Sequence, residues 1–598
     1  MSEYVAPLQD MQFVLRELAG IDDVASLPGQ EEVNEELATA ILAEAGKFAS
    51  GVLSPLNVVG DRQGARWTDG EVGTAPGWKH AYKQFVEGGW NALSCSTEFG
   101  GQGLPRIVSA LVEEMWNGAN VAFALCPMLT RGAIEALELC GSDVQKALYL
   151  PRLVSGEWSG TMNLTEPQAG SDLSAVRTRA LPQSDGSYLL HGQKIFITYG
   201  EHDLTPNIVH LVLARTPGAP EGVKGISLFV VPKFLVTEDG SPGAHNDVRC
   251  VSIEHKLGIH GSPTAVLAFG DNEGARGWLV GDENRGLEYM FIMMNAARYS
   301  VGLEGVGLCE RAYQRARDFA RERKQGSELG SGSRDKVAIV RHPDVRRMLL
   351  QMKTRTEALR AVACAVASAT DIATTHSDAA VRREKQAFVD LMIPVVKGWS
   401  TETSVFVTSL GVQIHGGMGY VEETGAAQHW RDSRITPIYE GTTGIQAADL
   451  AGRKIARDGG EAATKLTREM EFVQQKLESL RVHELASIAA QLGAGIAALR
   501  RCVGFVVERH SSDAKAIAAG AVPLLELFGI VAGGWQMARA ALVAHERLAQ
   551  GGGDAGYLKA KLLSAKFYAD HVLTQADGLA RTVVTGSGAI LDYEDEQF

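Results

Sequence analysis

The sequence predicts a mainly helical α+β protein in which one small β-domain lies between helical stretches. From about residue 31 to residue 153 of the 598-residue chain, apolar residues recur at helical spacing. Between about residues 160 and 270 the period changes to two, in short runs rich in Val, Ile, Leu and Phe. Helical periodicity returns after Gly286. The length indicates several domains.

Four domains are expected along the chain. Residues 31–159 form a helical domain and residues 160–275 the β-domain. Residues 276–458 form a second helical domain, and residues 459–598 an appended helical domain. The Gly, Ser and charged residues of 326–336 indicate an exposed loop within the third domain. The expected strands include 188–191, 208–214, 226–231 and 265–269.

Composition indicates an ordinary soluble globular protein. The 58 Lys and Arg residues against 71 Asp and Glu residues give a formal charge of −13, which argues against nucleic acid as a partner. The seven scattered cysteines form no CxxC pair, so we expect reduced thiols and no metal site.

The N-terminus lacks a signal-peptide pattern, and we expect a cytoplasmic protein. The most apolar late segment, residues 522–535, is short and contains Pro523 and Glu526. It is interpreted as a buried helix pair and not as a membrane span.

Two segments suggest a flavin site. The first, TEPQAGSD at residues 165–172, combines hydroxyls, a stiffening Pro and a small Gly, although an ordinary capped turn would explain it equally well. The second, KIFIT at residues 194–198, reads as a strand. Because strand side chains alternate, Phe196 and Thr198 should share a face that suits an isoalloxazine ring.

A glycine-rich segment, QIHGGMGY at residues 413–420, indicates a pyrophosphate contact. It lacks the strand-then-helix context of a Rossmann fingerprint, and no Walker lysine follows. Backbone N–H groups exposed by Gly416 and Gly417 could still hold a pyrophosphate. Arg323 is a candidate second phosphate contact, although an Arg at a charged helix end is more often only solvated.

The most distinctive segment is RDSRITPIYEGTTGIQ at residues 431–446. Together with the preceding motifs in this order, it resembles the acyl-CoA dehydrogenase family over about residues 35–453. The resemblance implies an α-helical domain, a β-barrel-like domain and a four-helix domain, with FAD as cofactor. The matching Glu in the family is the catalytic base, which implies that role for Glu440.

The resemblance also implies the other site residues. The cofactor-binding residues would be Met162, Leu164, Thr165, Gly170, Ser171, Phe196 and Thr198 beside the flavin, Arg323 at the pyrophosphate, Gln413, Gly416 and Gly417 at the adenosine diphosphate end, and Gly441, Thr442 and Thr443 along the cofactor. The substrate-binding residues would be Ser171, Asn295, Arg298 and Tyr439.

The sequence departs from the family pattern at four places. Phe196 replaces the usual Trp, and Asn295 stands where Asp is common. The loop after Arg323 lacks the usual Phe-Gly, and His342-Pro343 replaces a His-Gln pair. The appended domain and the Asn295 segment are similar to a longer bacterial branch that includes 3-(methylthio)propanoyl-CoA dehydrogenases.

The implied reaction is the α,β-dehydrogenation of an acyl-CoA to the trans-2-enoyl-CoA, with electrons passed to an electron-transfer flavoprotein. One carboxylate and one flavin suffice, and burial should raise the pKa of Glu440 toward a useful range for a base. A homodimer or a dimer of dimers is expected, in which the adjacent subunit supplies Gln413 to Gly417.

Three alternatives share this fold. An acyl-CoA oxidase would use the same base and flavin but would admit oxygen. A nitroalkane oxidase-like enzyme usually has Asp at the base position, so Glu440 argues against it. A DNA-associated flavoprotein would need a basic groove, for which the sequence offers no clustered Lys and Arg.

Overall fold

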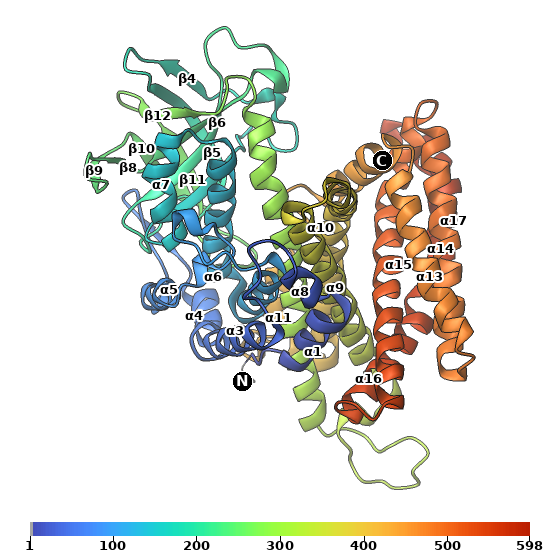
Figure 1. The fold of residues 1–598 in the computed structure, drawn as a ribbon. Helices are drawn as coiled ribbons and strands as arrows, with labels where there is room; N and C mark the ends of the chain where they lie inside the picture. Colours follow the sequence, from blue (N-terminus) through green and yellow to red (C-terminus); the bar gives the residue numbers. More distant parts are fainter. Residues whose placement is uncertain (1–3) are drawn as a thin grey trace. The chain divides into compact units, whose positions relative to one another are not determined.

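The protein is described from a computed structural model over residues 4–598. The chain folds into two compact units. One unit contains the N-terminal residues up to Gly46, together with Pro105–Gly118 and Val301–Phe598, and the other contains Lys47–Leu104 and Ala119–Ser300. Helices hold 63% of the residues and one region carries the main sheet, which confirms the predicted mainly helical α+β class (Figure 1).

The main sheet has eight strands and lies in the unit that contains residues 119–300. Its order is β10-β11-β5-β12-β7-β6-β3, and β4 pairs with β5. Among the described strand pairs of this sheet, β3 and β6 are parallel and the others are antiparallel. The strands are β3 (Ser159–Asn163), β4 (Arg179–Pro182), β5 (Tyr188–Thr198), β6 (Ile208–Ala214), β7 (Ser227–Pro232), β10 (Val248–Ile253), β11 (Thr264–Phe269) and β12 (Ala275–Val280). Two small hairpins pair β1 (Arg66–Thr68) with β2 (Glu71–Gly73) and β8 (Phe234–Val236) with β9 (Pro242–His245).

Both faces of this sheet are covered, which explains the uninterrupted apolar runs of β6 and β7. Successive residues of β6 enter different cores: Leu211 and Leu213 pack into one, and Val212 and Ala214 into the other. The first core also contains Leu137 and other residues of the helices. A strand buried on both faces is apolar throughout and does not alternate.

The helices of this unit are α4 (Ser54–Gln63), α5 (Trp78–Glu87), α7 (Asp143–Ser155) and the greater part of α6 (Arg106–Cys140). A capping box between Ser142 and Gln145 begins α7, and Gly156 in the left-handed conformation ends it. Helix α6 leaves helical geometry at Asn120, next to the boundary between the units. Helix α8 (Gly286–Glu322) passes from this unit into the other after Ser300.

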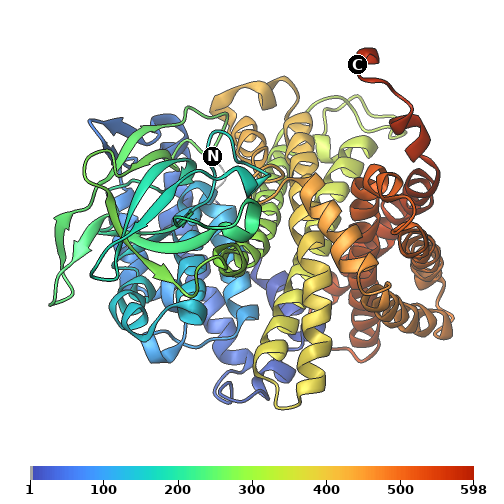
Figure 2. The same cartoon turned by 90° about the horizontal axis from the view of Figure 1, so that it is seen from above.

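The other unit is helical. Its helices are α1 (Leu8–Phe13), α2 (Ile21–Ala25), α3 (Glu35–Phe48), α9 (Pro343–Thr375), α10 (Ala379–His415), α11 (Ala426–Ser433), α12 (Thr443–Ala448), α13 (Glu461–Ser479), α14 (His483–Arg509), α15 (Ala514–Ala549), α16 (Ala555–His571), α17 (Ala576–Thr585) and α18 (Ser587–Leu591). The long helices α9 and α10 lie side by side (Figure 2). Helices α13 to α17, coloured orange to red, form the appended bundle (Figures 1 and 2).

The structure corrects the expected helix pair at residues 522–535. One helix, α15, runs through this segment with Pro523 inside it. Most of the residues after Pro523 in α15 are buried, and this packing stabilises the helix past the missing backbone N–H. The expected exposed loop at 326–336 is confirmed between α8 and α9.

Within residues 4–598, α14 and α15 are long and apolar enough to cross a bilayer by length and composition alone. In α15, 72% of the most apolar window is buried inside the protein, and in α14 44%. The predominant burial of α15 is typical of a core helix in a helical bundle.

Arg360 of α9 is buried at the centre of the helical unit, where it binds three carboxylates. Its guanidinium donates to Glu114 of α6 at 3.0 and 2.5 Å, to Glu310 of α8 at 2.7 Å and to Asp10 of α1 at 2.5 Å. Asp10 also pairs with Lys561 of α16. One buried charge cluster therefore joins helices that are far apart in the sequence, including one from the appended bundle.

Arg360→Met should destabilise the protein by about 3–5 kcal/mol, because it leaves buried carboxylates without their cation. Arg501→Met is the matched control, since its partner Asp577 is exposed and a surface pair contributes at most about 1 kcal/mol. The measurement is the urea midpoint followed by circular dichroism. Equal midpoints for the two variants would contradict a stabilising role for the cluster.

Candidate active site

Glu440 lies in the short loop between α11 and α12. Its backbone has φ +53°, a left-handed conformation that a residue with a Cβ adopts at a cost of about 1–3 kcal/mol. The next residue, Gly441, is also left-handed at φ +86°, where glycine meets no such penalty. Thr442 then caps α12 by accepting a hydrogen bond from the Ile445 backbone at 3.2 Å.

Side chains from neighbouring helices hold both neighbours of Glu440. The Tyr439 hydroxyl donates to Oε2 of Glu304, which lies on α8. Lys397 Nζ of α10 donates to the Gly441 carbonyl at 2.7 Å. Gln446 Nε2 donates to the carbonyl oxygens of Glu440 and Gly441, at 3.1 and 3.4 Å. These contacts over-determine the backbone on each side of Glu440, which is the condition under which a strained conformation persists.

The buried groups around this loop influence one another's titration. Burial raises the pKa of Glu304 to about 8, and the charge of Glu440 acts in the same direction, against the Tyr439 hydrogen bond and the Lys397 charge. Burial and the charges of Glu304 and Glu440 raise the pKa of Tyr439, so its hydroxyl remains a donor. Glu304 is fully buried whereas Glu440 is partly exposed, so of the two carboxylates Glu440 is the accessible one.

The structure places Tyr439 and Thr442 in this loop and Thr443 at the start of α12, with their hydroxyls already engaged. The Tyr439 hydroxyl faces Glu304, which leaves the ring for any substrate contact. The Thr443 hydroxyl donates to Glu402 at 2.6 Å. The positions of Glu402, Glu304 and Lys397 on long helices gave no sequence signal, because each is one charged residue in an ordinary helical pattern.

The segments TEPQAGSD and KIFIT lie side by side in the sheet-containing unit. Lys194 of β5 is buried and donates to the Leu164 carbonyl at 3.0 Å and to Glu166 Oε1 at 2.9 Å. The Ile195 backbone donates to the Thr165 carbonyl at 2.9 Å. The structure therefore brings the two predicted flavin-side segments together.

Glu166 and Lys194 were missed by the sequence reasoning. Burial alone would raise the pKa of Glu166, but Lys194 and hydrogen bonds from Thr178 and the Arg177 backbone lower it to about 2. Burial lowers the pKa of Lys194 to about 8 against the opposing effect of Glu166. The pair is therefore ionised at neutral pH. The available signal was a lysine directly before the apolar residues 195–197 of the strand.

Phe196 sits at an irregularity in β5. Its backbone is left-handed, at φ +59°, and the register with β11 shifts between Ala265 and Leu267. Phe196 is 59% exposed, whereas the following Ile197 is 2% exposed and Thr198 is intermediate. An exposed aromatic ring on a strained backbone is compatible with the predicted contact between Phe196 and a ligand.

The remaining flavin-side residues differ in exposure. Met162 and Leu164 are buried in the core beneath the sheet. Gly170 and Ser171 are exposed, and nothing lies within 4 Å of a Cβ built on Gly170. A ligand can therefore approach the backbone closely at Gly170.

In the helical unit, Gln413, Gly416 and Gly417 are exposed at the end of α10. Nothing lies within 4 Å of a Cβ built on either glycine. The Gly416 N–H donates to the Gln413 carbonyl, and a helix C-terminus carries negative partial charge. The Gly416 N–H is therefore already hydrogen-bonded within the chain. A ligand can reach the two glycines from the side on which a Cβ would point, where the space is open. Arg323 is exposed just after α8.

Asn295 and Arg298 lie three residues apart on α8, on the same helical face. Arg298 Nη1 donates to Asn295 Oδ1 at 3.3 Å. Arg298 is buried and Asn295 is exposed. The amide therefore orients the guanidinium, a role compatible with the predicted place of both residues in the substrate site.

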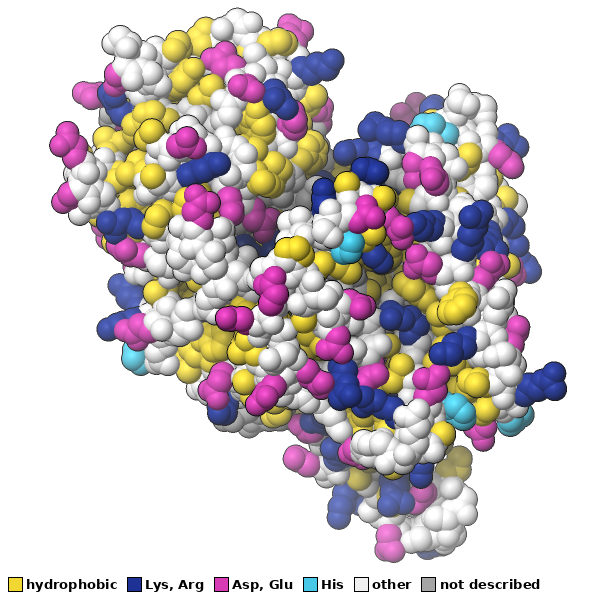
Figure 3. All heavy atoms as spheres, in the orientation of Figure 1, with side chains coloured by type: hydrophobic (Ala, Val, Ile, Leu, Met, Phe, Trp, Pro, Cys, Tyr) yellow, Lys and Arg dark blue, Asp and Glu magenta, His cyan; other side chains and the backbone are white. Residues whose placement is uncertain are grey.

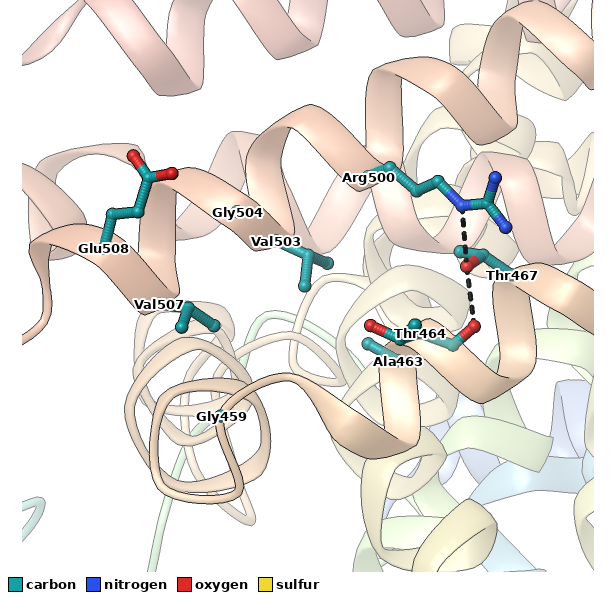
Figure 4. A pocket seen from close by; sticks show the side chains of 9 residues that line it. All are labelled: Gly459, Ala463, Thr464, Thr467, Arg500, Val503, Gly504, Val507 and Glu508. Atoms are coloured by element: carbon teal, nitrogen blue, oxygen red, sulfur yellow. Dashed lines mark hydrogen bonds between the residues drawn. The ribbon is translucent and has the colours of Figure 1, made fainter.

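A separate cavity of about 270 Å³ lies between α13 and α14 of the appended bundle (Figure 4). Arg500 lines it and donates to the Thr467 hydroxyl at 3.1 Å. None of the predicted site residues lines this cavity. On the face drawn in Figure 3, basic and acidic side chains are interspersed and form no single basic stripe.

Four family models match consecutive parts of the chain. They are the acyl-CoA dehydrogenase N-terminal domain at residues 36–157, the middle domain at 161–272, the C-terminal domain at 284–455, and an acetyl-CoA dehydrogenase C-terminal-like model at 453–594. The 3-methylmercaptopropionyl-CoA dehydrogenase of Ruegeria pomeroyi is 50% identical over 96% of each chain. The broad-specificity linear acyl-CoA dehydrogenase FadE5 of Mycobacterium tuberculosis is 34% identical over 100% of each chain.

Two solved structures share the fold over nearly the whole chain. ACDH-11 of Caenorhabditis elegans, in complex with C11-CoA, has a TM-score of 0.75 at 20% identity and covers 100% of this chain and 97% of its own. An acyl-CoA dehydrogenase from Bacillus anthracis, complexed with FAD, has a TM-score of 0.73 at 22% identity and covers 96% and 91%.

Gly441→Ala should disturb the Glu440 loop. A Cβ at this position would lie 2.6 Å from Gln446 Nε2, and the left-handed backbone adds a cost of about 1–2 kcal/mol. We expect a lower thermal midpoint and faster proteolysis within residues 434–446. Gly444→Ala is the control, since the nearest atom to its Cβ is 3.7 Å away and its backbone is helical. The prediction is wrong if both variants behave like the parent.

Proposed function

This chain belongs to the acyl-CoA dehydrogenase family and is an oxidoreductase that binds FAD. From this premise we propose that Glu440 removes the α-proton of an acyl-CoA thioester. The observation that carries the proposal is the Glu440 loop. A partly exposed carboxylate stands in a strained conformation, and side chains from α8, α10 and α12 hold the residues on either side of it.

The chain's own groups supply the proton chemistry. The Glu440 carboxylate accepts the proton from the α-carbon, whose acidity comes from the thioester carbonyl. The Glu440 backbone N–H is the proposed donor to the thioester oxygen, and it would stabilise the charge that develops there. Anchoring of Tyr439 and Gly441 keeps both groups of Glu440 in place during the transfer.

FAD, when bound, would supply the acceptor for the hydride that leaves the β-carbon as the Cα–Cβ double bond forms. The residues present fit a flavin. Phe196 presents an exposed ring from a strained strand, and Gly170, Gly416 and Gly417 leave open space beside their backbone. Phe196 and Thr198 are proposed to face the isoalloxazine, and Gln413 to Gly417 the adenosine end.

A short acyl-CoA is the proposed substrate, with 3-methylmercaptopropionyl-CoA as the first candidate. The relative named for that activity is 50% identical over almost the entire chain. The proposed acceptor is an electron-transfer flavoprotein. We also propose a homodimer, since exposed Met418, Tyr420 and Val421 follow the Gly416 and Gly417 segment directly.

Glu440→Gln should abolish turnover while leaving the fold and FAD content intact. The amide keeps the size of the side chain and the backbone N–H but cannot take the α-proton. A positioned general base contributes about a hundred- to ten-thousand-fold, and we expect a loss at or beyond the upper end. The measurement is anaerobic bleaching of the flavin after addition of acyl-CoA.

Glu423→Gln is the matched control for this variant, because Glu423 is exposed in the preceding segment and bears on no proposed step. Substrate should still perturb the flavin spectrum of Glu440→Gln without bleaching it. Bleaching of that variant at a near-normal rate would place the base elsewhere.

We expect straight, branched and methylthio acyl-CoA substrates to differ in kcat/KM, and the short methylthio compound to have one of the highest values. Differences of about 10- to 200-fold are expected from one or two methylene groups in an apolar pocket. Assays with an electron-transfer flavoprotein and with oxygen identify the acceptor. Formation of one hydrogen peroxide for each acyl-CoA oxidised in air would show that the protein is an oxidase and not a dehydrogenase.

A further inference from the structure

Glu304 is a buried carboxyl group beside the Glu440 loop that no step of the proposed reaction uses. It lies on α8 and is 0% exposed. Its Oε2 accepts the hydrogen bond from the Tyr439 hydroxyl, while Oε1 has no hydrogen-bond partner within residues 4–598. Burying a carboxyl group with one oxygen unsatisfied costs free energy, so the presence of such a group requires an explanation.

The hydrogen bond between Glu304 and Tyr439 helps to fix the position of Glu440. Tyr439 immediately precedes Glu440, and Gly441 immediately follows it. Glu304 holds Tyr439 from α8, and Lys397 holds the Gly441 carbonyl from α10. Both helices are long, and the loop is therefore hydrogen-bonded at two points to two separate helices. Glu440, left-handed between these points, has little freedom to move.

Glu304 does not fit the role of base itself. It is fully buried and its Oε2 is occupied by Tyr439, whereas Glu440 is partly exposed. Three titratable groups act on Glu304: Tyr439 from the loop, Lys397 from α10 and Glu440. Burial raises the pKa of Glu304, so at neutral pH it adds little negative charge beside Glu440. A second full carboxylate charge there would oppose ionisation of Glu440.

We propose that Glu304 is a positioning residue for the base, acting through its hydrogen bond to Tyr439. The proposal rests on the proposed role of Glu440. In this proposal the Glu304–Tyr439 hydrogen bond increases the rate of proton removal by Glu440, in addition to any contribution that it makes to the free energy of unfolding. Two consequences distinguish it from a structural role. A neutral acceptor at position 304 should suffice, and loss of either partner should have the same effect.

The test uses four variants of the full-length FAD-loaded protein. Glu304→Gln keeps an acceptor for Tyr439, and Glu304→Leu removes it. Tyr439→Phe removes the donor, and the double variant Glu304→Leu/Tyr439→Phe removes both. Tyr568→Phe is the matched control, because its buried hydroxyl donates to the Ile530 carbonyl at 3.1 Å in the appended bundle.

The readouts are the thermal midpoint, the FAD content and the rate of anaerobic flavin bleaching. The rate is measured as a function of the concentration of 3-methylmercaptopropionyl-CoA, or of the best substrate of the screen. Glu304→Leu and Tyr439→Phe should each lower the bleaching rate at saturating substrate by about 10- to 100-fold, the effect of a small misplacement of a catalytic group. FAD content and substrate affinity should change little. Glu304→Gln should stay within about threefold of the parent, because the hydrogen bond to Tyr439 is retained.

The double variant should be no slower than the slower single variant, because both changes remove the same interaction. Tyr568→Phe should lower only the thermal midpoint. The proposal falls if Glu304→Leu bleaches at the parent rate, if Glu304→Gln is as slow as Glu304→Leu, or if the two single effects multiply. Should Glu304→Leu fail to fold, Tyr439→Phe and Glu304→Gln still decide the question.

Glu440→Gln, measured in parallel, separates this proposal from the proposed function. If that variant is inactive and Glu304→Leu is unaffected, only the role of Glu304 is overturned. If Glu440→Gln bleaches at a near-normal rate, the base is elsewhere and the assignment of Glu304 falls with it.

Discussion

The helical unit depends on the burial of one guanidinium. Arg360 can lie in the interior only because Asp10, Glu114 and Glu310 surround it with negative charge and accept its hydrogen bonds. These carboxylates come from three different helices, so the charge balance is complete only when α1, α6, α8 and α9 are correctly assembled. Lys561, which pairs with Asp10, extends the same requirement to the appended bundle.

Helix α8 connects this charge cluster to the loop that contains Glu440. Glu310 and Glu304 lie six residues apart on α8, about 9 Å along the helix axis. Arg360 binds the first, and Tyr439 binds the second. The position of α8 that satisfies the buried charge cluster is therefore also the position that holds the loop of Glu440. The proposed catalytic geometry and the assembly of the helices therefore both depend on α8.

A second buried ion pair performs a comparable task in the sheet-containing unit. Lys194 on β5 reaches Glu166 and the Leu164 carbonyl, and so joins the two segments expected beside the flavin. Breaking such a pair leaves a buried charge uncompensated, which costs more than the pair itself contributes. In both units, a buried lysine donates to a backbone carbonyl of a segment that is predicted to contact ligand: Lys194 to Leu164 and Lys397 to Gly441.

Much of this protein could be predicted from its sequence. Periodicity predicted the mainly helical fold, the strands at 208–214 and 265–269, and the loop after α8, because these features depend on local patterns of burial. The motif containing Glu440 predicted the family. The helix pair predicted at 522–535 was wrong, because a proline can remain inside a helix when its neighbours are buried.

The supports of the site were decided only by the tertiary structure. Glu304, Lys397 and Glu166 are ordinary charged residues in their local sequence, and their partners are 28 to 135 residues away. The left-handed backbone of Glu440 and Phe196 is likewise invisible in composition, since neither residue favours it. The sequence by itself determined the family and which residue types are available for the proposed chemistry, because residue type sets acidity and hydrogen bonding. Only packing could decide which distant side chains hold them in place, because burial and proximity exist only in the folded chain.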